Sequence, residues 1–424
     1  MRGSLNSRWL AATGCLVAAL AMGAAACGGD DEPEGGGGAE GGEARTLNVY
    51  SSLPLQGASR PQTTAMVQGM ELALEQAGNK AGEFTIEYQS LDDSTAQAGS
   101  WTPEATQANA RQVAQDENAA VYLGEFNSGA SAISIPILNE AGVPQISPAN
   151  TAVGLTSDEP GADKGEPTKY YPSGFRNYER IVPKDTIQGA ALATVMKEDG
   201  CTKVAMANDK EVYGAGLARN IAGSAEEQDL NIIFNEGIDT KAPNYRSLAS
   251  RAKSQGADCF VFSGITSNNG VQIFKDFEAA LPDGKLYGPD GVAETGFIDP
   301  KGGGIPADVA AKVKVTVATL DPASYPPEGR EFFAAFEREY KDSNPDPYAI
   351  YGYEAMRLAI DAIERSQTGK KEDIVKALFA TKDRSSVLGT YSIDENGDTT
   401  LTDYGVYTIK GGELDFDKTV EAAT

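Results

Sequence analysis

The chain has 424 residues and a net charge of −25 at pH 7, with 61 acidic against 36 basic residues. Its length indicates two globular domains with additional segments. The acidic surface repels phosphate backbones and argues against nucleic acid as a partner. The absence of histidine removes the commonest general base, the commonest metal ligand and every serine–histidine or cysteine–histidine catalytic set. We therefore expect a protein that is not an enzyme, with no catalytic residues, metal or cofactor.

The N-terminus is typical of an export signal. Arg2 and Arg8 precede an uncharged apolar run over residues 10–26, which is short for a membrane-spanning helix and suits a signal peptide. The run ends in three alanines before Cys27, which resembles the lipobox of bacterial lipoproteins, although Ala24 replaces the usual Leu. Cys27 would then carry a lipid. The alternative is an ordinary signal peptide that a cysteine happens to follow.

The segment after Cys27 is rich in Gly, Glu and Asp up to residue 45. This composition predicts a flexible tether with a reach of about 25 Å. We therefore expect a signal peptide over residues 1–26, a lipid-anchored linker over residues 27–45, and an extracytoplasmic protein attached to the cell membrane by its lipid. No later segment is apolar and long enough to span a membrane.

From residue 46 onward, short apolar runs typical of strands alternate with amphipathic runs typical of helices. In a first series we expect strands over residues 47–52, 84–91, 119–124 and 144–147, and helices over residues 62–76, from Pro103, and from Ser128 as N-cap to Gly142. After a loop over residues 158–168, we expect strands over residues 203–208, 231–234, 259–263 and 285–288, and helices over residues 183–198, 214–228, 244–255 and 268–280. This alternation predicts an α/β protein with two doubly wound parallel-sheet lobes.

The last third of the chain adds to these lobes rather than building a third. We expect helices over residues 332–340, 351–365 and 373–380 that complete the first lobe, and strands over residues 391–393 and 404–409. The Asn396-Gly397 dipeptide predicts a hairpin turn between these two strands, and its glycine is misplaced for a calcium loop. The predicted lobes are residues 46–178 with 320–390, and residues 179–319 with 391–424.

Ligands of open parallel sheets bind beyond the carboxyl ends of the strands, where helix N-termini point. In the first series these loops hold Ser128, at a helix start that suits a carboxylate, and the run Ala149, Asn150 and Thr151, which Pro148 keeps extended.

In the second series the equivalent loops hold Tyr213, Thr266 and Asp290. Structural alternatives exist for several of these residues: Ser128 as a helix cap, Tyr213 as a packing aromatic, and Asp290 with Gly291 as a turn.

Five segments, in this order along the chain, resemble the leucine–isoleucine–valine-binding family of periplasmic binding proteins. They are VYLGEFNSGASAISIPILNEAGVPQISPANT, FRNYERIVPKDTIQG, ANDKEVYGAGLARN, YGPDGVAE and YAIYGYEAMRLAIDAIE. The resemblance extends from about residue 46 to the C-terminus. It implies two Rossmann-like lobes, joined by three crossovers, that close on an amino acid.

The resemblance also implies roles for individual residues. Ser128 and the backbone around Ala149 and Thr151 would hold the α-carboxylate, while Thr151, the Ala149 carbonyl and Asp290 would hold the α-ammonium. Tyr213 would close over the ligand, and Tyr348 would line its side-chain pocket.

Three residues depart from the family pattern. Asp290 replaces the more usual Glu, Gln62 stands where the leucine-binding member has an aromatic residue, and Thr266 stands where another Tyr lies. These departures predict a pocket more polar than one for leucine.

The resemblance implies a monomeric solute-binding protein of an ABC importer that captures a branched-chain or related amino acid, with an ABC permease as partner. Two alternatives remain open. One is a ligand-sensing subunit for small amides or organic acids in a signalling system. The other is an extracellular hydrolase, which would need a nucleophile elbow, a metal cluster or a paired acid and base.

Two cysteines remain outside the predicted leader, Cys201 and Cys259. Cys201 lies just before the first strand of the second series and Cys259 begins the third, and these strands are parallel neighbours in a doubly wound sheet. In an oxidising compartment we expect a disulfide between them, with two buried free thiols as the alternative.

The lipid anchor leads to the first prediction. Replacing Cys27 by Ala removes the acylated thiol, so the protein is expected either to enter the medium or to remain unprocessed. Detergent phase partitioning of the two chains measures this difference. Unchanged partitioning of Cys27→Ala would rule out the anchor.

Overall fold

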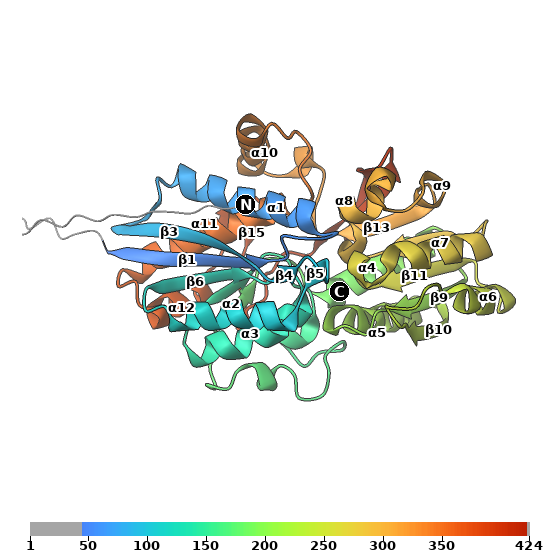
Figure 1. Ribbon diagram of the computed structural model, residues 1–424, viewed down its shortest axis with the longest axis horizontal. Helices are drawn as coiled ribbons and strands as arrows, with labels where there is room; N and C mark the ends of the chain where they lie inside the picture. Colours follow the sequence, from blue (N-terminus) through green and yellow to red (C-terminus); the bar gives the residue numbers. More distant parts are fainter. Residues whose placement is uncertain (1–44, 422–424) are drawn as a thin grey trace, which may run out of the picture. The chain divides into compact units, whose positions relative to one another are not determined.

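The computed structural model describes residues 45–421, and the predicted signal peptide, Cys27 and nearly all of the predicted linker therefore lie outside the described residues. Two sheets with helices on their faces make up this part of the chain (Figure 1). Among these residues, no helix combines the length and apolar character that crossing a membrane requires.

The first sheet has the strand order β2-β3-β1-β6-β7-β8, with all pairs parallel except β2 with β3. Its strands are β1 (Thr46–Leu53), β2 (Lys80–Ala81), β3 (Phe84–Asp92), β6 (Ala119–Gly124), β7 (Gln145–Ser147) and β8 (Tyr178–Arg180). A separate small hairpin, β4 (Ser94–Thr95) with β5 (Ser100–Trp101), follows β3.

Alternate residues of β1 pack against helices on opposite faces of this sheet. Val49 belongs to the core with Met66 and Met70 of α1 (Arg60–Gln76), which packs against α11 (Ala349–Ser366). Tyr50 points to the other face, into a cluster with Val113 of α2 (Pro103–Gln115) and with α3 (Ser128–Glu140). Both faces of the strand are therefore buried, and its polar residues Ser51 and Ser52 are buried as well.

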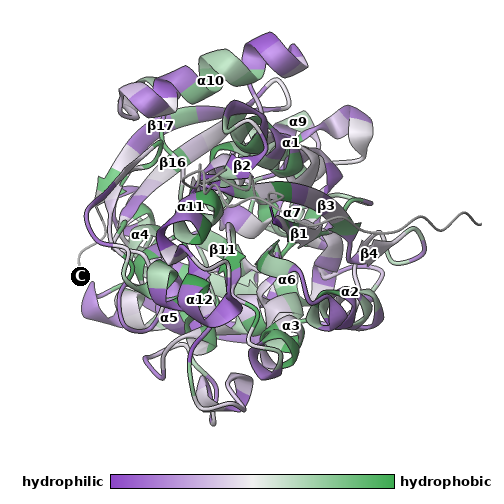
Figure 2. Cartoon of the chain, turned by 90° about the vertical axis from the view of Figure 1, so that its left-hand side faces the viewer, coloured by the Kyte–Doolittle hydropathy of each residue, from purple (hydrophilic) through white to green (hydrophobic). Residues whose placement is uncertain are grey.

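The second sheet has the strand order β10-β9-β11-β12-β13-β16-β17. The first five strands are parallel, and β16 and β17 continue the sheet in antiparallel fashion. The strands are β9 (Lys203–Asn208), β10 (Asn231–Gly237), β11 (Cys259–Ser263), β12 (Lys285–Gly288), β13 (Val313–Val317), β16 (Asp403–Lys410) and β17 (Glu413–Glu421). The helices are α4 (Asp185–Glu198), α5 (Val212–Glu227), α6 (Arg246–Ser254), α7 (Gly270–Ala280), α8 (Thr295–Ile298) and α9 (Ala307–Ala310). Figure 2 shows the central strands, such as β11, in hydrophobic colours, and much of α12 in hydrophilic ones.

The chain passes between the two sheets three times: from β8 to α4, from β13 to α10 (Pro327–Tyr340), and from β15 (Gly389–Tyr391) to β16. Helices α10, α11 and α12 (Lys371–Phe379) pack with the first sheet or with α1. The expected fold of two doubly wound lobes with three crossings is therefore confirmed. Because β8 runs to Arg180, we propose to place the first lobe boundary after this residue rather than after residue 178.

The expected hairpin between residues 391–393 and 404–409 is wrong. Strand β15 pairs with β14 (Arg384–Ser386), and β16 pairs with β17. The connection between β16 and β17 runs through Gly411 and Gly412, whose positive φ angles of 66° and 88° suit a tight turn between antiparallel strands. Asn396-Gly397 does form a turn, but only the single bridge between Ile393 and Thr399 closes it.

Cys201 lies just before β9, and Cys259 opens β11, the strand paired directly with β9. Their Cα atoms are 5.8 Å apart and their sulfur atoms are bonded. The bridge closes a loop with a sequence separation of 58 residues inside the second sheet. Both residues are buried.

The bridge leads to a second prediction. A chain with Cys201→Ser and Cys259→Ser loses the constraint on its unfolded state, so its free energy of unfolding should fall by about 2–4 kcal/mol in urea titrations. Mass spectrometry of alkylated, unreduced protein tests the bond itself. Two alkylated thiols among these cysteines would contradict it.

Candidate ligand-binding site

Loops at the carboxyl ends of strands from both sheets line one cavity. Its lining residues are Trp101, Phe126, Asn127, Ser128, Gly129, Ala149, Thr151, Glu211, Tyr213, Ile265, Asp290, Gly291 and Tyr348. Six residues predicted from the sequence are among them: Ser128, Ala149, Thr151, Tyr213, Asp290 and Tyr348. The rule that ligands bind where parallel strands end therefore locates the cavity on both lobes.

The N-terminus of α3 forms one wall of this cavity. The helix begins at Ser128, and its N-cap is Asn127, whose carbonyl accepts hydrogen bonds from the N–H groups of Ala130 and Ser131 at 3.0 and 3.1 Å. The expectation that Ser128 caps this helix is wrong by one residue. The first-turn N–H groups of Ser128 and Gly129 have no partner within the helix, and they suit an anionic group.

Gly129 is required at this wall because the indole of Trp101 packs on it. A Cβ at position 129 would lie 2.7 Å from Trp101 Cζ2, closer than real Cβ atoms come to another atom. The same Cβ would lie 3.3 Å from Glu211 Oε2, which belongs to the loop between β9 and α5. Side chains from two separate loops thus cover the first turn of α3.

The loop over residues 149–152 forms the next wall. The hydroxyl of Ser147 accepts the N–H groups of Ala149 and Asn150 at 3.2 and 2.9 Å. The Asn150 amide donates to the Phe126 carbonyl at 2.8 Å and accepts from the Tyr178 hydroxyl at 3.1 Å. Asn150 therefore joins two site loops but does not line the cavity.

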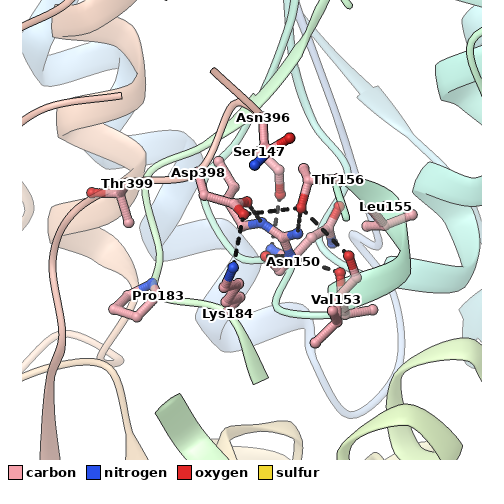
Figure 3. Close-up of polar contacts among 12 residues, drawn as sticks. Ser147, Asn150, Val153, Leu155, Thr156, Pro183, Lys184, Asn396, Asp398 and Thr399 are labelled. Atoms are coloured by element: carbon pink, nitrogen blue, oxygen red, sulfur yellow. Dashed lines mark hydrogen bonds and ion pairs between the residues drawn. The ribbon is translucent and has the colours of Figure 1, made fainter. Parts of the chain in front are cut away.

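A fully buried arginine, Arg180, supports this loop. Figure 3 shows three of its hydrogen-bond partners, Asn150, Thr156 and Asp398. Arg180 Nη1 donates to the carbonyls of Asn150 and Ala152 at 3.2 and 2.8 Å, on either side of Thr151. Its Nε pairs with Asp398 Oδ1 at 2.7 Å, and its Nη2 donates to Thr156. These bonds fix the carbonyls that flank Thr151 and so orient Thr151 in the cavity wall.

Asp290 lines the cavity from the second lobe and is only 6% exposed. Its Oδ1 accepts from the Tyr213 hydroxyl, and its Oδ2 accepts from the Tyr348 hydroxyl at 2.6 Å. Burial raises the pKa of Asp290 above its usual range, while the two hydroxyls act in the opposite direction. Tyr348, expected as an apolar ring, thus also presents a polar group.

A second carboxyl group lies behind Asp290. Asp185 is fully buried, and neither of its carboxylate oxygens has a hydrogen-bond partner among residues 45–421. Burial, followed by the charge of Asp290, raises the pKa of Asp185 well above its usual range. A cation bound at Asp290 would therefore favour the ionised form of both carboxyl groups.

Two predicted residues, Gln62 and Thr266, do not line the cavity. Gln62 is buried in the first turn of α1, and neither polar atom of its side chain has a described partner. Thr266 donates to the Gly291 carbonyl at 3.4 Å.

Sequence reasoning missed Trp101, Phe126, Glu211 and Ile265. Glu211 stands two residues before Tyr213 in a loop that had already been singled out, so its charge was a usable signal. Trp101 belongs to the β4–β5 hairpin, for which no sequence pattern was found.

Another pair of acids lies under the loop that precedes α3. Glu125 is fully buried, accepts from the Tyr122 hydroxyl at 2.7 Å through Oε1, and has no described partner for Oε2. Asp93 is fully buried with no described partner for either oxygen. Burial raises the pKa of Glu125 to about 7, and burial together with the charge of Glu125 raises the pKa of Asp93 well above its usual range.

Comparison with known proteins gives consistent results. Residues 51–413 match the family described as "Periplasmic binding protein". A leucine-, isoleucine-, valine-, threonine- and alanine-binding protein of Pseudomonas aeruginosa is 25% identical over 86% of this chain and 90% of its own length. A leucine-binding protein of Thermotoga maritima has a TM-score of 0.76 at 21% identity, covering 88% of this chain and 99% of its own. A solute-binding protein of an ABC transporter from Rhodopseudomonas palustris, in complex with p-hydroxybenzoic acid, has a TM-score of 0.72 at 19% identity, covering 89% of this chain and 98% of its own.

The buried acid pair leads to a third prediction. A carboxyl group whose pKa rises from 4.5 to about 7 on folding stabilises the fold below pH 4.5, and this contribution is lost as the pH rises toward 7. The side chain of the Glu125→Gln variant cannot ionise. Its free energy of unfolding, taken relative to the wild type, should therefore be about 2–3 kcal/mol higher at pH 8 than at pH 4.5. Urea unfolding at both pH values measures this change.

The matched control is Glu140→Gln at the exposed C-terminal end of α3, the helix that follows the Glu125 loop. Its free energy of unfolding should differ from that of the wild type by the same amount at both pH values. An equal result for Glu125→Gln would contradict the prediction, because it would show that folding does not raise the pKa of Glu125.

Proposed function

Since this chain belongs to the periplasmic binding protein family, we propose that it is an extracytoplasmic receptor that captures an amino acid for an ABC importer. The observation that carries this proposal is one cavity with a free helix N-terminus at one wall and a buried carboxylate at another. These two features match the two charges of an α-amino acid.

In the proposed complex, the N–H groups of Ser128 and Gly129 and the backbone around Ala149 and Thr151 hold the carboxylate. Asp290 holds the ammonium group, and the free Ala149 carbonyl supports it. Donor and acceptor groups are already fixed by the fold, so binding requires little ordering of the site.

Closure of the two lobes completes the site in this proposal. The first lobe contributes α3 and the loop over residues 149–152, and the second contributes Glu211, Tyr213 and Asp290. Ser100 of the first lobe and Ser267 of the second already share a hydrogen bond of 3.1 Å at the rim. We further propose that the lipid on Cys27 anchors this monomer to the membrane and that an ABC permease receives the solute.

The fourth prediction tests the charge at Asp290. Asp290→Asn leaves the ligand ammonium buried without its counter-charge, so affinity should fall by about 2–5 kcal/mol, or roughly thirtyfold or more. Ser128→Ala removes one neutral hydroxyl beside backbone donors that persist, and it should cost about 1–2 kcal/mol. Titration calorimetry with the amino acid that raises the unfolding temperature most measures both.

Asp283→Asn, an exposed acid of the second lobe, is the matched control and should leave affinity unchanged. If Asp290→Asn binds as tightly as the wild type, the solute is not an α-amino acid held in this way. A small amide or an organic acid, as in the p-hydroxybenzoic acid complex, then becomes the better candidate.

A further inference from the structure

The cavity holds more negative charge than a simple zwitterion requires. Both Asp290 and Glu211 line it, and its lining residues include no Lys or Arg. A ligand with one ammonium and one carboxylate would satisfy Asp290 and the α3 N-terminus. Glu211 would then remain beside the ligand without a counter-charge.

The backbone at Glu211 is held in place by its own loop. Glu211 is the N-cap of α5, and its N–H donates to Asp209 Oδ1 at 3.0 Å. Its Oε2 lies 3.3 Å from the position that a Cβ on Gly129 would occupy, so the carboxylate lies against the first turn of α3. Within residues 45–421, no Lys or Arg forms an ion pair with Glu211.

A second, independent acceptor lies at the same wall. Asn127 lines the cavity, is 8% exposed, and its Oδ1 has no hydrogen-bond partner among the described residues. A buried acceptor without a donor costs free energy unless a ligand or water supplies one. Asn127 Oδ1, next to the half-buried Glu211 carboxylate, therefore calls for an N–H donor in addition to the ammonium at Asp290.

Building on the proposed function, we propose that the solute is an amino acid with a second, cationic nitrogen group in its side chain. Asp290 binds the α-ammonium, the N–H groups of α3 bind the carboxylate, and Glu211 with Asn127 binds the distal cation. An aliphatic side chain at this wall would desolvate Glu211 and leave it unpaired. A carboxylic acid without a cation would face two carboxylates.

Titration calorimetry on the full chain tests the proposal with pairs of equal shape, lysine against norleucine and arginine against citrulline. In at least one pair the cationic member should bind at least tenfold more tightly than its neutral partner. Glu211→Gln should bring that ratio to within about twofold of one. It should leave the affinity for the neutral partner unchanged or higher.

Glu227→Gln, an exposed residue at the far end of α5, is the matched control and should keep the wild-type ratio. Tighter binding of leucine or norleucine than of every cationic amino acid would overturn this inference while leaving the proposed function intact. Binding of a diamine such as putrescine as tightly as lysine would also overturn it, because the α-carboxylate would then contribute nothing. If no amino acid of either class binds, the proposed function itself fails.

Discussion

The buried ion pair between Arg180 and Asp398 connects the parts of the chain that form the site. Arg180 ends β8 at the first crossing between the lobes, and Asp398 lies in the third crossing. The same guanidinium binds the two carbonyls that flank Thr151, and the Arg180 N–H donates to the Gly397 carbonyl at 2.9 Å. Removing one member of such a pair strands the other charge in the interior, at a cost of about 3–5 kcal/mol. The ion pair between Arg180 and Asp398 thus holds the first and third crossings together and fixes the shape of the loop over residues 149–152.

The Arg180 guanidinium binds groups of the protein itself, and no Lys or Arg is among the residues that line the cavity. Asp290 accepts hydrogen bonds from two neutral tyrosine hydroxyls, and its charge raises the pKa of Asp185, whose oxygens have no described hydrogen-bond partner. Such an arrangement makes the empty site less stable than a neutral one of the same shape. A ligand that brings positive charge removes part of this penalty, so the same residues that weaken the empty fold strengthen binding.

The sequence predicts the fold in detail where periodicity and topology are unambiguous. Alternating strands and helices give both sheets, and the adjacency of β9 and β11 brings Cys201 beside Cys259. The family assignment made from quoted motifs is confirmed by the match over residues 51–413. Prediction fails at the last hairpin, because Asn396-Gly397 and Gly411-Gly412 are both turn signals and only tertiary pairing selects between them. Strand β13 was missed because its run of five residues is short and carries a lysine.

The site also contains residues that the sequence locates and residues that it does not. Ser128, Thr151 and Asp290 follow strands directly, so a general rule about sheet edges locates them in the cavity wall. Trp101 reaches the wall through the geometry of a small hairpin, which no local pattern encodes. Glu211 reaches it from a helix cap, and only its charge beside Tyr213 marked it in the sequence. In the proposed complex, Ser128, Thr151 and Asp290 bind the groups that all α-amino acids share. Trp101 and Glu211, which were not predicted from the sequence, would lie against the rest of the ligand, so they would carry information about which solute is bound.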